Sequence, residues 1–360
     1  MIKNFRRVTA VLADSACCHL INFINWRLPD RTNSPAELAN YVARCKTLTR
    51  QEFYSKEPIK RLHIGPDFLS WSSPVESGFS RNDIASARFF LSRKGWAAPT
   101  VLFLHALMSA SDFGYQHIAR RFNQRGWNAV LVHLPFHYRR VPSGHLNGAL
   151  ALTSDLIRNA ETIQQAVMEM RQLLELFRIH GADRFGLIAT SYGGWIGSVL
   201  LSLEEDFEFA ALLQPIVDIE EAIWNSPAAV TIRSRLRRHL IAPGISRQHA
   251  HLSCPFDGKP LVDQKNIHLL AGEFDQIVPS KTLQRFAETW SVPNLEIAPQ
   301  GHFGYVAMKR VLRRLGLVLV LVVVLPTSLV NRPDYPKSRS FVGQAVLESG
   351  VATDLHCMLV

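Results

Sequence analysis

The sequence has few cysteines, and their spacing supports neither a disulfide framework nor a zinc site. Of 360 residues only five are cysteine, an odd number, and no pair is spaced as Cys-x-x-Cys. Small secreted domains and zinc modules depend on such patterns. We therefore expect no metal and a reducing compartment, which means a cytoplasmic protein that is either free or associated with a membrane.

The apolar run near the C-terminus is too short for a standard membrane-spanning helix. Leu315 to Val330 carries no charge, but Pro326 interrupts it and a spanning helix needs about 20 apolar residues. Three interpretations stay open: a buried final element, a peripheral membrane contact through residues 309–330, or a segment without a role. Residues 331–360 are polar and contain Pro and Gly, so we expect a poorly ordered tail.

Acidic residues are fewer than basic ones. Asp and Glu number 30 against 40 for Lys and Arg, which gives a net charge of +10. Such a charge suits nucleic acid or an anionic membrane. The basic residues are spread along the chain and no nucleic-acid motif is present, so we expect no nucleic-acid partner. The cluster at 233–238 is interpreted as a solvated face or as the entrance for an anionic substrate.

The N-terminal stretch has no clear secretory signal. Basic residues at positions 3, 6 and 7 precede a mildly apolar segment. Asp14, His19 and the lack of a small-residue cleavage site argue against secretion. Helical patterning over the first sixty residues predicts helices packed on the outside of the main domain, and no chemistry is visible in them.

Strands and helices alternate from residue 99 onward, which predicts an α/β fold with a mostly parallel twisted sheet and helices on both faces. The chain is 47% hydrophobic, enough for one large domain with an inserted cap. We expect the following divisions: an N-terminal extension with opening strands (1–84), the main domain (85–312) with a helical cap (216–260), an apolar segment (313–330) and the tail (331–360).

One stretch, residues 185–201, predicts a buried strand, a tight turn and an immediate helix. Ser191 stands at the corner, and Ala189, Gly193 and Gly194 supply the small neighbours that a strained turn requires. The motif Ala-Thr-Ser-Tyr-Gly-Gly resembles the Gly-x-Ser-x-Gly nucleophile elbow of the α/β-hydrolase superfamily, with Ala in place of the first Gly.

Two later loops match the same superfamily in the order Ser, acid, His. Gly-Glu-Phe-Asp275-Gln-Ile-Val-Pro resembles its Gly-x-x-Asp-x-x-Val-Pro turn, and Gln-Gly-His302-Phe-Gly resembles its Gly-His loop. The resemblance implies a Ser191–Asp275–His302 triad. Asp218 is an alternative acid, although we expect it to cap the helix that begins at Ile219.

The resemblance also implies an oxyanion hole made of two backbone N–H groups. Tyr192, the residue after the nucleophile, would supply one. Leu107 would supply the other, because His105-Ala-Leu-Met resembles the superfamily's His-Gly-x turn, again with Ala for Gly. His105 is interpreted as a loop brace, and His133 and His137 lack the spacing of metal ligands.

These resemblances imply a serine hydrolase that cleaves a carboxylic ester through an acyl-enzyme, similar to esterases, lipases and dienelactone hydrolases. The substrate would be a small-molecule ester or a lipid, with no metal or organic cofactor. Two alternatives stay open: a non-catalytic α/β-hydrolase scaffold that binds a ligand or protein, and a membrane-peripheral lipid hydrolase. The motifs select neither an acyl group nor an oligomeric state.

Overall fold

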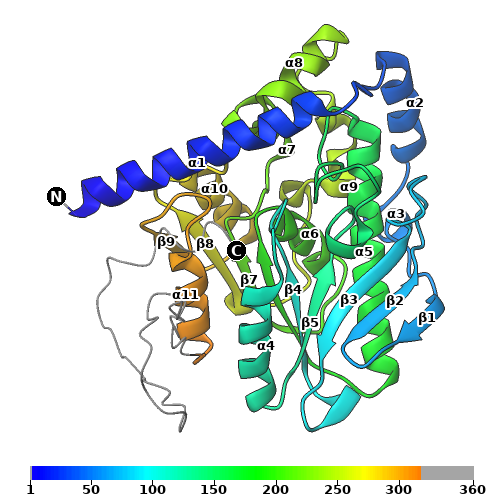
Figure 1. Ribbon diagram of the computed structural model, residues 1–360, viewed down its shortest axis with the longest axis vertical. Coiled ribbons are helices and arrows are strands. Elements are labelled where there is room, and N and C mark those ends of the chain that lie inside the picture. The colour runs from blue at the N-terminus through cyan, green and yellow to red at the C-terminus, as the bar shows by residue number, and fades with distance from the viewer. Residues whose placement is uncertain (1, 318–360) are drawn as a thin grey trace, which may run out of the picture.

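In the computed structural model, residues 2–317 are described, and their strands form one nine-stranded sheet (Figure 1). The spatial order is β1-β2-β3-β5-β4-β6-β7-β8-β9. The strands are β1 Lys60–Ile64, β2 Phe68–Ser72, β3 Ile84–Phe90, β4 Thr100–Leu104, β5 Asn128–His133, β6 Phe185–Thr190, β7 Phe207–Leu213, β8 Ile267–Gly272 and β9 Asn294–Ala298. The first three pair antiparallel and the others parallel, so the predicted mostly parallel sheet is confirmed.

Helices cover both faces of the sheet. α4 and α11 pack on one apolar cluster, and α5, α6 and α10 on the other (Figure 1). The helices are α1 Ile2–Arg27, α2 Pro35–Cys45, α3 Arg50–Phe53, α4 Phe113–Gln124, α5 Leu156–Ile179, α6 Tyr192–Leu201, α7 Ile219–Trp224, α8 Val230–Arg238, α9 Ala250–Ser253, α10 Ser280–Trp290 and α11 Val306–Arg314. A parallel sheet with both faces covered explains why β4 is buried along its whole length.

The helix α5 begins at Leu156. Asp155 is the reason, because its side chain accepts a hydrogen bond from the Arg158 N–H (3.0 Å) and caps the helix. Asn159 reaches back to the backbone N–H and carbonyl of Thr153, which holds the preceding residues in a loop.

The cap segment (residues 216–260) contains α7, α8 and α9, and its basic cluster is not simply a solvated face. Arg235 is only 6% exposed and donates to backbone carbonyls at the end of α1, including Leu28 (2.6 Å). Arg233 donates to the carbonyls of Ile223 and Ser226. Because Arg235 is buried and bonded to backbone carbonyls, the solvated-face interpretation is wrong for this residue, whereas Arg237 and Arg238 are exposed.

At the C-terminal end of the described chain, α11 packs through Val311 and Leu312 against the sheet. The apolar run predicted over 315–330 is described only as far as Leu317, which is buried. The rest of that run and the predicted tail over 331–360 lie outside the described residues.

Candidate active site

Ser191 occupies a sharp turn between β6 and α6. Its backbone has φ 52° and ψ −113°, a region that a residue with a side chain adopts only under strain. The turn is held by hydrogen bonds from the Ser191 N–H to the Leu213 carbonyl (2.9 Å) and from the Trp195 N–H to the Ser191 carbonyl (3.0 Å). The turn places the side chain of Ser191 at the carboxyl end of β6, in front of the first turn of α6.

Small residues around the turn are required by close backbone contacts. A Cβ at Gly193 would lie 2.5 Å from the Leu104 carbonyl oxygen, and one at Gly194 would lie 2.7 Å from Cβ of Pro215. Ala189 replaces the first glycine of the motif, and its methyl group faces Gly197, where an added Cβ would come within 3.0 Å of it. Gly197 has no side chain at this contact and therefore leaves room for the methyl group of Ala189.

The structure brings Ser191, Asp275 and His302 together in the predicted order. Ser191 Oγ lies 2.7 Å from His302 Nε2, and His302 Nδ1 lies 2.8 Å from Asp275 Oδ2. All three side chains are at least nine-tenths buried. A hydroxyl that donates to Nε2 requires the proton of the neutral imidazole to be on Nδ1, where it donates to the carboxylate.

The carboxylate of Asp275 is held by its own loop. Its Oδ1 accepts hydrogen bonds from the N–H groups of Ile277 (2.8 Å) and Val278 (2.9 Å). Its Oδ2 is therefore oriented toward His302. The alternative acid Asp218 instead caps α7, where it accepts from the Glu221 N–H at 3.0 Å. The predicted capping role of Asp218 is confirmed.

Gln214 connects the two triad loops and is absent from the sequence prediction. Its amide nitrogen donates to Asp275 Oδ2 (2.6 Å) and to the carbonyl of Gly301 (2.8 Å), while its amide oxygen accepts from Gln300. Gln214 follows the buried strand β7 directly and is itself buried. An amide buried just past a core strand needs partners, and this is the signal that could have identified it.

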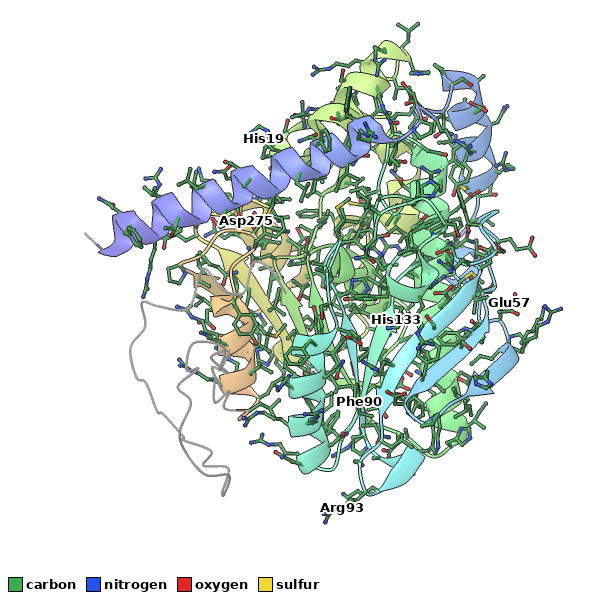
Figure 2. The ribbon with its side chains drawn as sticks, in the orientation of Figure 1. His19, Glu57, Phe90, Arg93, His133 and Asp275 are labelled. Atoms are coloured by element: carbon green, nitrogen blue, oxygen red, sulfur yellow. The ribbon has the colours of Figure 1, made fainter. Side chains whose placement is uncertain are left out.

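Asp14 of α1 also connects these loops, which corrects the prediction of N-terminal helices without chemistry. Both of its oxygens lie 2.9 Å from the His302 N–H, and Oδ2 accepts from the Gln276 N–H at 3.2 Å. Asp14 is 1% exposed, and Figure 2 shows the Asp275 loop directly beneath α1. The sequence signal for this contact was that Asp14 is the single acidic residue of its helix. In the sequence analysis this residue served only as an argument against a secretory signal.

The charges of the site raise the pKa of His302 above its ordinary value. Burial alone lowers this pKa, but the charge of Asp275, its hydrogen bond and the charge of Asp14 outweigh that effect. The pKa of Asp14 is itself raised, mainly by burial and also by the charge of Asp275, while its backbone hydrogen bonds oppose the shift.

The loop after β4, which carries the predicted oxyanion donor Leu107, is braced by two neutral histidines. His105 Nε2 accepts from the Leu134 N–H (3.2 Å), and His137 Nε2 accepts from the Met108 N–H (3.0 Å). Burial lowers the pKa of His105 to about 3 and that of His137 well below its ordinary value. Neutral rings can accept these bonds, so the observed contacts of His105 are those of a loop brace.

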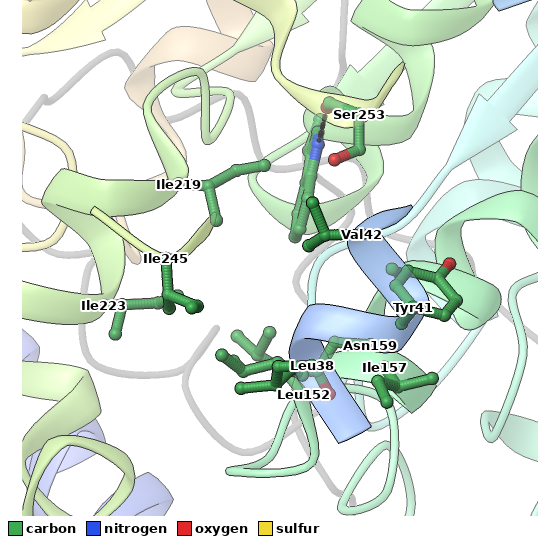
Figure 3. A pocket seen from close by; sticks show the side chains of 13 residues that line it. Leu38, Tyr41, Val42, Leu152, Ile157, Asn159, Ile219, Ile223, Ile245 and Ser253 are labelled. Carbon is green, nitrogen blue, oxygen red and sulfur yellow. Dashed lines mark hydrogen bonds between the residues drawn. The ribbon is translucent and has the colours of Figure 1, made fainter. Parts of the chain in front are cut away.

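A small apolar cavity lies between α2 and the cap segment (Figure 3). Its volume is about 40 Å³, and its lining includes Ile219 and Ile223 of α7 and Leu38 of α2. Trp195, one turn after Ser191, also lines it and donates its indole N–H to the Ser253 carbonyl (2.6 Å). The cavity therefore adjoins α6, the helix that begins directly after Ser191.

In the described part of the chain, no group of three or more His, Cys, Asp or Glu side chains is arranged to hold a metal ion. Cys17, Cys18, Cys45 and Cys254 are free thiols.

The architecture is similar to that of solved esterases. Acetyl xylan esterase 1 from Thermoanaerobacterium sp. JW/SL YS485 matches 80% of this chain and 95% of its own, with a TM-score of 0.54 and 14% identity. The chain has the α/β-hydrolase fold. The acetyl xylan esterase from Paenibacillus sp. R4 matches 81% of this chain and 97% of its own, with a TM-score of 0.51 and 13% identity.

No family model matches the sequence. Two uncharacterized proteins of Mycobacterium tuberculosis, from strains CDC 1551 and H37Rv, are each 29% identical over 194 residues. These residues are 53% of this chain and 46% of each relative, so the match spans about half the length of the curated relatives.

Proposed function

We propose that this protein is a serine hydrolase that cleaves a carboxylic ester through an acyl-enzyme. The observation that carries the proposal is the hydrogen-bonded chain from Ser191 Oγ through His302 to Asp275, with distances of 2.7 and 2.8 Å. An isolated serine hydroxyl is a poor nucleophile, and this arrangement supplies the base and the orienting carboxylate that activate it.

In the proposed reaction, Ser191 Oγ attacks the ester carbonyl while His302 Nε2 takes the hydroxyl proton. His302 then returns that proton to the departing alcohol, which leaves an acyl group on Ser191. A water molecule attacks this acyl-enzyme with His302 again as base, and the acid is released. Asp275 orients the imidazole and stabilises its positive charge during both steps.

The oxyanion would be held by the backbone N–H groups of Tyr192 and Leu107. Tyr192 is the first residue of α6, so its N–H has no partner within the helix. The positive end of the α6 dipole adds to the stabilisation of negative charge. The loop that carries Leu107 is fixed by the His105 and His137 braces, which favours a preorganised donor.

The test is hydrolysis of p-nitrophenyl esters with acyl chains of two to sixteen carbons, comparing the wild type with Ser191→Ala. We expect the wild type to hydrolyse at least one of these esters, and Ser191→Ala to turn it over at least about a thousandfold more slowly. Equal rates in the two proteins would contradict the proposal. A folded wild type that is inactive on every ester would favour the alternative, a non-catalytic scaffold.

A further inference from the structure

The helix α1 presents its apolar side chains outward, the reverse of an ordinary surface helix. Its large exposed side chains recur every three, four or eight residues and therefore share one face. They form the outer stripe, which consists of Phe5, Val8, Leu12, Leu20, Phe23 and Trp26, each 56–64% exposed. From the first to the last of these, the stripe runs about 30 Å along the helix.

The opposite side of α1 carries the polar contacts to the rest of the protein. Asp14 binds the loops of the triad, and Asn22 donates to the Pro227 carbonyl (2.8 Å) and accepts from the Thr231 N–H (2.8 Å). Asn25 is also buried. The polar side is thus anchored to the active site and the cap segment, and the apolar side faces away from both.

The charges of α1 are complementary to an anionic surface. Asp14 is its only acidic residue, and it is buried, while Arg6, Arg7 and Arg27 are all exposed. Lys3 adds a further positive charge in the sequence of the helix. α8 packs beside α1 and contributes the exposed Arg237 and Arg238.

From these observations we propose that α1 docks this protein on the surface of an anionic lipid bilayer. The outer stripe enters the headgroup boundary, with the helix axis in the membrane plane and the neighbouring arginines near lipid phosphates. Aromatic side chains such as Phe23 and Trp26 are favoured at this depth, and basic residues add attraction to anionic lipids. Figure 1 shows the N-terminal end of α1 extending past the strands, and within residues 2–317 the side chains of the outer stripe are exposed.

Docking in the membrane plane differs from crossing the membrane. By length and composition alone, the stretch Asn4–Arg27 is long and apolar enough to cross a bilayer. Crossing would place Asp14 near the bilayer centre, which is costly for a carboxylate. It would also remove Asp14 from the N–H groups of Gln276 and His302. Lying in the interface leaves these contacts intact.

The experiment is flotation of the full chain with vesicles of phosphatidylglycerol and phosphatidylcholine, compared with vesicles of phosphatidylcholine alone. We expect preferential binding to the anionic vesicles, weakened by salt. The triple variant Leu12→Gln, Phe23→Gln, Trp26→Gln should bind them at least about tenfold more weakly, because it removes apolar area from the stripe.

The matched control removes three apolar side chains of similar exposure elsewhere, with Ile84→Gln, Ile179→Gln and Leu261→Gln, and should bind as the wild type does. Replacing Arg6 and Arg27 with Gln should weaken binding to the anionic vesicles several-fold. Circular dichroism of each variant distinguishes a loss of fold from a loss of docking.

Three outcomes would overturn the proposal. Absence of flotation, or equal loss in the triple variant and its control, would show that the stripe does not bind lipid. Retention in the membrane after a carbonate wash would show a spanning helix instead. If the protein does not float with vesicles but sedimentation shows a dimer that the triple variant does not form, the outer stripe binds a second copy of the chain instead of lipid. None of these readouts depends on catalysis.

Discussion

Gln214 and Asp14 each connect the loop that carries Asp275 to the loop that carries His302. Gln214 donates to the carboxylate of one loop and to the Gly301 carbonyl of the other. Asp14 accepts from backbone N–H groups on both loops. Two side chains outside the triad, one at the end of β7 and one on α1, therefore help to hold Asp275 in place relative to His302.

The variant Asp14→Asn tests this positioning role. Loss of the charge leaves the His302 loop less firmly held, and we expect kcat to fall about tenfold or more, since small misplacements of a catalytic group are costly. Asp263→Asn, which alters an exposed carboxylate paired with Lys265, is the control and should leave kcat unchanged. An unchanged kcat in Asp14→Asn would show that α1 does not position the site.

The pH dependence of kcat/KM gives a separate prediction. Neutral His302 is the active form, so activity falls as pH drops through its pKa. Because Asp275 and Asp14 raise that pKa, the wild-type acid limb should lie above about 6.5. Asp14→Asn removes one raising charge and should move the limb to lower pH. A limb that stays in place or moves upward would contradict this electrostatic account.

His302→Ala should lower turnover by at least about a thousandfold, because the members of a triad act as a unit. Circular dichroism checks that the variant is folded. His105→Ala offers a contrast, because the His105 ring hydrogen-bonds to backbone groups and takes no part in the proposed proton transfer. Its loss should loosen the loop that carries Leu107 and lower turnover by less than His302→Ala does. A decrease of less than about tenfold in His302→Ala would mean that another group serves as the base.

At the scale of single residues, the sequence predicted those sites that carry local motifs. Ser191, Asp275 and His302 each stand in a short pattern that follows a strand, so their approach in space could be expected from chain order. Asp14 could not be found in this way, because it lies 288 positions from its partner His302 and no local pattern marks it. Such a contact depends on how a helix crosses the finished fold.

Among the elements, the cap segment is expected to select the acyl chain. Ile219 of α7 is half-buried and lines the apolar cavity beside Trp195 (Figure 3). Ile219→Ala enlarges this space, so the preferred p-nitrophenyl ester should become longer. Val230→Ala, on the exposed side of α8, should leave the preference unchanged. An identical chain-length profile in both variants would show that this cavity does not receive the acyl group.

Element boundaries were predictable wherever periodicity or caps decided them. α7 begins at Ile219 as predicted, because Asp218 caps it, and Asp155 sets the start of α5 in the same way. The basic residues of α8 illustrate the opposite case. A charged side chain on a helical pattern indicates solvent, but Arg235 is drawn inward by unpaired carbonyls at the end of α1, a partner that sequence periodicity does not reveal.

For the whole molecule, the alternation of strands and helices was sufficient to predict a mostly parallel sheet covered on both faces. It did not predict that the N-terminal helix would cross the carboxyl edge of that sheet. That placement brings an outward apolar stripe and the loops that carry Asp275 and His302 onto opposite sides of one helix. The molecule is thereby organised so that one helix links a candidate membrane surface to the candidate active site.

Labelling by a fluorophosphonate, with the modified residue identified by mass spectrometry, tests directly whether Ser191 is an activated nucleophile. We expect one covalent adduct on Ser191, its absence in Ser191→Ala, and strongly slowed formation in His302→Ala. Adduct formation on another residue, or a folded wild type that remains unmodified at Ser191, would contradict the claim that this triad activates its serine.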